Sequence, residues 1–169
     1  MTIRHIPILD GLALPHDANC WFAPYSNANG TSTQDAMVLN MSGTADSGLK
    51  GVLLLPQNYV GTPKVLIDWS SQTTGSNVFF EFRSRSMTQG TDAFDISTSP
   101  TEQVDSVTTS GKPGLADDVE EDTITLTAGA KAAGELMYWE LWRQAATEAG
   151  DTLTASIQVF GAWLEYSDA

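Results

Sequence analysis

Two glutamates, Glu81 and Glu140, each lie between aromatic residues in stretches that alternate between apolar and polar side chains. Sandwich-type glycosidases use two carboxylates across a sheet, about 5 Å apart when they retain the configuration of the sugar. Two observations argue against that chemistry at Glu81. It points away from the apolar side of its own strand, and Arg83 and Arg85 share its side. A salt-bridged exterior is therefore the simpler interpretation of this strand.

No other residues have the type and spacing that catalysis or cofactor binding requires. His5 and His16 lie in an irregular, proline-containing segment, where no rigid element holds a general base. Cys20 has no basic residue within three positions, so we expect a small buried hydrophobic residue and no thiolate. The acidic run 117–122 lacks the spacing of a calcium loop and is expected to be a solvated strand entry. The sequence thus predicts no catalytic residue, no cofactor and no metal site.

The five tryptophans leave two interpretations open. Exposed indole rings stack on sugar rings, which would suit a carbohydrate-binding module. Most of these tryptophans, however, fall on the apolar side of alternating segments. We therefore expect most of them in the core.

Composition excludes several classes of protein. Twenty-one acidic residues stand against eight Lys and Arg, so the net charge of −13 repels nucleic acid. No apolar run exceeds four residues, so neither a membrane span nor a secretory signal is expected. A single cysteine excludes an internal disulfide. The sequence predicts a soluble, acidic protein with one folded domain.

Period-two alternation and β-branched residues indicate strands throughout residues 35–169. Turn residues separate these segments, and only one short stretch could form a helix. We predict an all-β fold, an antiparallel jelly-roll β-sandwich of about eight strands, near 35–41, 50–55, 64–71, 77–85, 101–108, 119–127, 135–143 and 154–166. The expected core includes Val65, Ile67, Trp69, Val78, Phe80, Phe82, Ile124, Leu126, Met137, Trp139 and Leu141.

Residues 1–34 differ from the rest, because a proline interrupts their apolar pieces every eight or nine residues. This segment is predicted to be an irregular arm, and two placements stay open. It folds over its own domain, where it could add an edge strand, or it reaches onto a neighbouring subunit. In the second case the contact residues would be Ile3, Arg4, Ile6, Ile8 and Leu9.

Several stretches together form one pattern, which begins with residues 51–59, 65–69 and 77–82. An Ala-Gly-Glu strand with alternating aromatic residues and an arginine follows at 133–144, then a Gly-Asp-Thr-Leu turn at 150–155 and a last strand ending in Glu-Tyr at 159–166. This pattern, which covers about two-thirds of the chain, resembles a group of small virion proteins of tailed bacteriophages. The first 34 residues take no part in it, and no catalytic residue comes with it.

The resemblance implies a capsid decoration or cement protein that binds the outside of the phage head. Its partner would be the major capsid protein, its assembly a homotrimer, and its location the virion, after synthesis in the cytoplasm of the bacterial host. Because three chains would carry −39 in total, subunit contacts are expected to be apolar or to use Arg83, Arg85 and Arg143 against carboxylates. The alternative is a receptor- or glycan-binding module of a phage tail or head fibre.

Overall fold

In the part of the chain that the computed structural model describes, every regular element is a β-strand. The structure describes residues 2–9, 14–15, 18–26, 32–88, 103–127 and 132–169, and in these residues no helix is long and apolar enough to cross a membrane. The strands are β1 (Thr2–Pro7), β2 (Leu14–Pro15), β3 (Cys20–Ser26), β4 (Ser32–Met41), β5 (Ser47–Leu54), β6 (Tyr59–Ser71), β7 (Ser76–Met87), β8 (Gln103–Lys112), β9 (Glu120–Thr125), β10 (Leu136–Arg143) and β11 (Ile157–Asp168).

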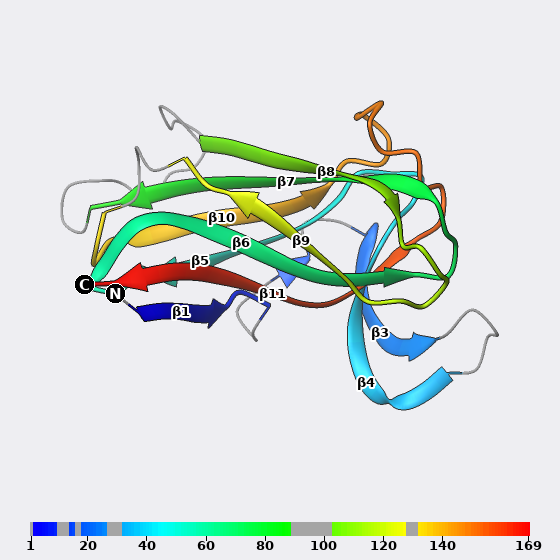
Figure 1. The fold of residues 1–169 in the computed structure, drawn as a ribbon, viewed down its shortest axis with the longest axis horizontal. Helices are drawn as coiled ribbons and strands as arrows, with labels where there is room; N and C mark the ends of the chain where they lie inside the picture. Colours follow the sequence, from blue (N-terminus) through cyan, green and yellow to red (C-terminus); the bar gives the residue numbers. More distant parts are fainter. Residues whose placement is uncertain (1, 10–13, 16–17, 27–31, 89–102, 128–131) are drawn as a thin grey trace.

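These strands form two antiparallel sheets that pack face to face (Figure 1). The first has the order β3-β4-β11-β6-β9, with β1 also paired to β11. The second has the order β2-β5-β10-β7-β8. The predicted antiparallel jelly-roll sandwich is therefore confirmed, and each of the eight predicted strands corresponds to one of β4 to β11.

The core between the sheets includes all of the side chains that the alternation predicts to be buried. All eleven predicted core residues are buried, each no more than 2% exposed. Two aromatic contacts lie in this core. Trp69 of one sheet meets Phe80 of the other edge-on, with 5.9 Å between ring centroids, and Phe82 stacks on Trp139 of the neighbouring strand at 6.2 Å. Inward-facing residues of both sheets thus interdigitate as expected for a sandwich.

The expectation of an irregular arm over residues 1–34 is wrong for the residues described there. Three strands, β1, β2 and β3, lie in this segment and pair with β11, β5 and β4. Proline is tolerated because these strands lie at sheet edges, where a missing N–H leaves no internal ladder bond unmade. Pro7 is the last residue of β1, and a register irregularity follows Pro24 in β3.

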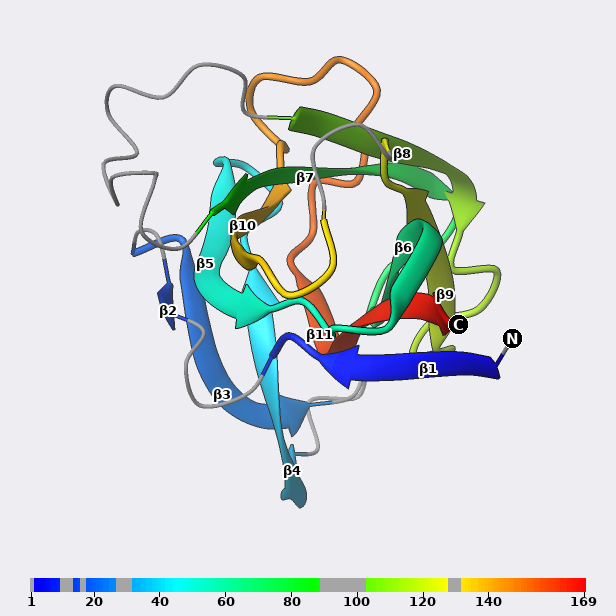
Figure 2. The same cartoon turned by 90° about the vertical axis from the view of Figure 1, so that its left-hand side faces the viewer.

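Strand β1 lies along β11, and Figure 2 shows the start of β1 close to the end of β11. Thr2 is the register partner of Asp168, whose carboxylate also accepts a hydrogen bond from Arg4 at 2.9 Å. Ile8 is a core residue at 3% exposure, and Ile6 and Leu9 pack against the core.

These contacts favour the interpretation in which the first residues fold onto their own sandwich. Ile8 is buried there and so cannot serve as a contact for another subunit, as the second interpretation had it. Ile3, by contrast, is 61% exposed. Its contact with a second subunit stays a prediction.

One buried carboxylate couples the stability of the core to pH. The indole N–H of Trp69 donates to Asp122 at 2.6 Å, and the Asp122 side chain is almost fully buried. Burial raises the pKa of Asp122 above its usual range, although the hydrogen bond from Trp69 acts in the opposite direction. The folded state therefore binds this proton more tightly than the unfolded state does.

We expect Asp122→Asn to be more stable than the native protein at neutral pH, because the amide removes a desolvated charge and can still accept from Trp69. The native protein gains stability as the pH falls through the raised pKa of Asp122, so the difference between the two proteins should shrink on acidification. Urea denaturation at several pH values measures this difference. A difference that stays constant from neutral to acid pH would contradict the assignment.

Candidate functional site

Fewer of the five tryptophans lie in the core than the sequence analysis predicts. Trp69 and Trp139 lie in the core at 0% and 2% exposure. Trp21 is 44% exposed, while Trp142 and Trp163 are half-buried on the outer faces of the two sheets. The expectation that most tryptophans are core residues is wrong, and three indole rings reach the surface.

Trp163 lies on the outer face of the six-stranded sheet. Its neighbours along β11, Ala162 and Leu164, are buried in the core, so Trp163 points the other way. Its register partners are Pro7 on β1 and Leu66 on β6. An aromatic ring therefore lies between two apolar side chains in one cross-strand row.

A glycine lets the Trp163 ring lie across the sheet. A Cβ atom at Gly161 would stand 2.2 Å from the indole Cη2 atom, so the six-membered ring lies directly above this glycine. A β-bulge between Val159 and Gly161 brings Gly161 to the outer face. Among the described residues, no hydrogen bond joins the Trp163 indole N–H to a partner. The ring is thus held against the backbone on one side and is partly open to solvent.

Charged side chains occupy the rows on both sides of Trp163. In one row, Glu165 forms an ion pair with Lys64 and contacts the His5 ring, each at 3.3 Å. In the other row, Asp68 on β6 is the register partner of Glu121 on β9. We call this surface the Trp163 face, and it comprises His5, Pro7, Lys64, Leu66, Asp68, Glu121, Trp163 and Glu165.

Trp142 lies on the five-stranded sheet, in a cluster of side chains that bond to one another. Its ring covers Gly48, where a Cβ atom would stand 2.7 Å from the indole Cδ2 atom. Its N–H donates to Glu140 at 2.8 Å, and the hydroxyl of Tyr138 donates to the other oxygen of the same carboxylate at 2.6 Å. The guanidinium of Arg83 lies over the ring, 5.5 Å from its centroid. A ligand would have to displace these contacts to reach the indole face.

The predicted salt-bridged exterior of β7 is present. Arg83 donates to Glu81 at 2.5 Å on the outer face of the five-stranded sheet, and Arg85 lies on the same face. Register brings Glu81 opposite Trp142 and Arg83 opposite Glu140. Participation of Arg83 and Arg85 in subunit contacts stays a prediction.

Arg143 is not available to another subunit, contrary to the expectation from the sequence. It is fully buried, and its guanidinium donates to both carboxylate oxygens of Asp151 at 2.9 and 3.0 Å. It also donates to the backbone carbonyl oxygens of Leu153 and Ala155. The physical reason is the alternation of side chains along a strand: Arg143 follows Leu141 by two residues and therefore lies on the same inward side of β10. It fixes the 151–155 segment against the sandwich.

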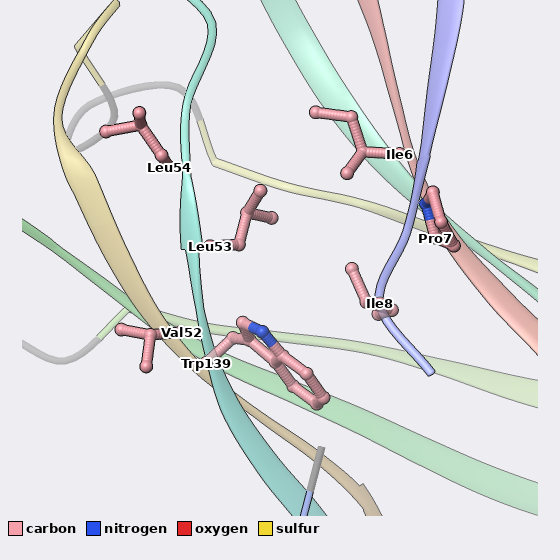
Figure 3. A pocket seen from close by; sticks show the side chains of 7 residues that line it. All are labelled: Ile6, Pro7, Ile8, Val52, Leu53, Leu54 and Trp139. Carbon is pink, nitrogen blue, oxygen red and sulfur yellow. The ribbon is translucent and has the colours of Figure 1, made fainter. Parts of the chain in front are cut away.

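Two cavities are weaker candidates for a binding site than the Trp163 face. The first is an apolar crevice of about 190 Å³ between β1 and β5, with the indole of Trp139 at its base (Figure 3). Its remaining lining is aliphatic or proline: Ile6, Pro7, Ile8, Val52, Leu53 and Leu54. The second, of about 310 Å³, has no aromatic ring and is lined by Asn40, Gln72, Thr73, Ala155, Ser156 and Gln158. Neither combines an aromatic ring with charged groups.

The structure describes most of the remaining sequence candidates. Cys20 is buried in the core at 3% exposure, as predicted. His5 contacts Glu165, and the side chain of His16 lies outside the described residues. In the part of the chain that the structure describes, no group of three or more His, Cys, Asp or Glu side chains could hold a metal ion.

Comparison with known proteins gives structural neighbours only, because no family model and no curated protein matches the chain. The xylan-binding domain CBM22-2 of Xyn10C from Paenibacillus barcinonensis is 10% identical, with 93% of this chain and 92% of that chain covered and a TM-score of 0.54. A family 35 carbohydrate-binding module from Clostridium thermocellum is 10% identical over 100% of both chains, with a TM-score of 0.53. The family 35 module of Abf62 from Cellvibrio japonicus is 8% identical over 96% and 92%, with a TM-score of 0.50.

The likeness is one of fold. At such low identity it adds support for the jelly-roll sandwich and assigns no ligand to this chain. None of the structures named here is a virion protein. The resemblance to phage virion proteins, the capsid and trimer partners and the virion location therefore stay predictions.

Proposed function

We propose that this protein is a non-catalytic carbohydrate-binding module whose ligand stacks on Trp163. The observation that carries the proposal is the half-buried indole lying over Gly161, with an N–H that makes no hydrogen bond within the described residues. The fold it shares with carbohydrate-binding modules supports the same proposal. This is the glycan-binding alternative of the sequence analysis.

The Trp163 face has the groups that a sugar needs. The indole gives a flat apolar surface for the C–H face of a pyranose ring, and its N–H can donate to a ring oxygen or hydroxyl. Lys64 and Glu165 lie one cross-strand row away and can bond to hydroxyl groups at the rim. The surface is open, so only one face of the sugar is desolvated. We expect a modest affinity, with a Kd on the order of 0.1 mM, or about 5.5 kcal/mol.

Trp163→Ala should weaken binding of the best-bound polysaccharide at least about tenfold, which corresponds to about 1.4 kcal/mol. The physical reason is loss of the stacking surface, and the melting temperature of the variant shows whether it stays folded. Affinity electrophoresis against a panel of polysaccharides, followed by titration calorimetry, measures the effect.

Trp21→Ala is the matched control, because Trp21 is an exposed tryptophan on β3, which β4 separates from β11 in the same sheet. It should bind like the native protein. Loss of binding in this variant, with Trp163→Ala unaffected, would place the ligand on the β3–β4 hairpin. Failure of every polysaccharide to bind would remove the proposed function altogether.

A further inference from the structure

Two carboxylates lie next to Trp163 on the same face of the sheet. Asp68 and Glu121 are register partners on β6 and β9, where side chains directly opposite share a face about 4.5–5.5 Å apart. Neither makes an ion pair with a residue that the structure describes. Glu165, on the other side of the ring, is flanked by two basic groups. The two sides of the ring therefore differ in charge.

Asp68 also lies opposite the part of β11 that the ring covers. It is the register partner of Gly161, the glycine that the Trp163 indole covers. Burial raises the pKa of the Asp68 carboxyl, and the charge of Glu121 raises it further. Like charges directly opposite each other destabilise a sheet. An added positive charge at this point would relieve the repulsion.

We propose that the Trp163 face prefers amino sugars, with Asp68 and Glu121 binding the sugar ammonium group while the pyranose ring stacks on Trp163; this inference rests on the proposed function. An ammonium group placed here is attracted by both carboxylates and by the electron-rich indole face. A neutral sugar would use the carboxylates as hydrogen-bond acceptors only. A uronic acid would be repelled by them. The ring supplies the affinity for a sugar, and the carboxylate pair supplies the preference for its charge.

The test compares three oligosaccharides of equal length and linkage. A β-1,4-linked glucosamine tetramer carries ammonium groups, the N-acetylglucosamine tetramer carries acetamides, and cellotetraose carries hydroxyls. At a pH where the sugar amine is protonated, we expect the glucosamine tetramer to bind at least about tenfold more tightly than either neutral tetramer. In the double variant Asp68→Asn/Glu121→Gln this preference should disappear, so that the three tetramers bind with affinities within about twofold of one another.

A matched double variant controls for net charge. Asp118→Asn/Glu148→Gln removes the same two charges elsewhere in the chain and should keep the preference. Loss of the preference in this variant would assign it to overall charge and overturn the inference. An oligolysine that binds the native protein as tightly as the glucosamine tetramer would show recognition of ammonium without a sugar, which also overturns it.

The outcomes separate this inference from the proposed function. If all three tetramers bind equally and Trp163→Ala weakens all of them, the proposed function stands and the amino-sugar preference fails. If no tetramer and no polysaccharide binds, both fail.

Discussion

Replacing Arg143 by methionine should cost about 3–5 kcal/mol of unfolding free energy, because Asp151 would be left buried and unpaired. The change also removes two donors to backbone carbonyl groups of the 151–155 segment. Urea denaturation at neutral pH measures the loss. The loss is comparable with the total stability of a typical domain, about 5–15 kcal/mol, so the variant is expected to be close to unfolding at 37 °C.

Lys112→Met gives the matched control, because Lys112 contacts Glu120 at 3.1 Å and its side chain, unlike that of Arg143, is partly exposed at 37%. Surface ion pairs are worth about 0.2–1 kcal/mol, so this variant should be nearly as stable as the native protein. Adding Asp151→Leu to the Arg143→Met variant should recover part of the loss, since it removes the unpaired charge. Equal stability of Arg143→Met and the native protein would mean that the buried ion pair is not formed.

Phe80→Ala should destabilise the protein by about 3–5 kcal/mol, because the ring is fully buried and packs edge-on against Trp69. The near-ultraviolet circular dichroism of the variant should also change as Trp69 loses its aromatic neighbour. Phe22→Ala is the comparison, since Phe22 is 46% exposed on β3 and its removal leaves no cavity. We expect that change to lie within about 0.5 kcal/mol of the native stability. Similar losses in both variants would contradict the assigned core.

Alternation predicts the sandwich well because one face of each central strand is buried. In β7, Val78, Phe80 and Phe82 repeat every second residue and all three are inaccessible. The same rule, applied one step further along β10, places Arg143 on the inner side with Leu141. A buried arginine needs an acceptor. Asp151, which is close to Arg143 in the sequence, is the residue from which this partner could have been predicted.

The spacing of the prolines gives a wrong prediction for the first strands, because that argument treats every strand as internal to a sheet. β1 and β3 each pair along one edge only, so their prolines interrupt no central ladder. A sequence gives no direct sign of which strands will be edges. The apolar residues of the segment, especially Ile8, were the better guide to its burial.

The Trp163 face is harder to predict, because it depends on a β-bulge. Strict alternation from the buried Val159 would place Trp163 on the inner side of β11. The bulge before Gly161 shifts the phase by one residue, so Ala162 turns inward and Trp163 outward. A glycine within a strand is a recognised sign of such a bulge, and Gly161 was therefore the one available signal.

The pairing of β1 with β11 brings the two ends of the described chain to neighbouring positions, with Thr2 beside Asp168 (Figure 1). Neighbouring ends let a domain be spliced into a surface loop of a host protein with short linkers and little strain on either fold. In such a chimera both junctions lie at one end of the sandwich, and Trp163 is five residues along β11 from Asp168. The sandwich could thus be inserted into a loop of another protein and would expose its Trp163 face there.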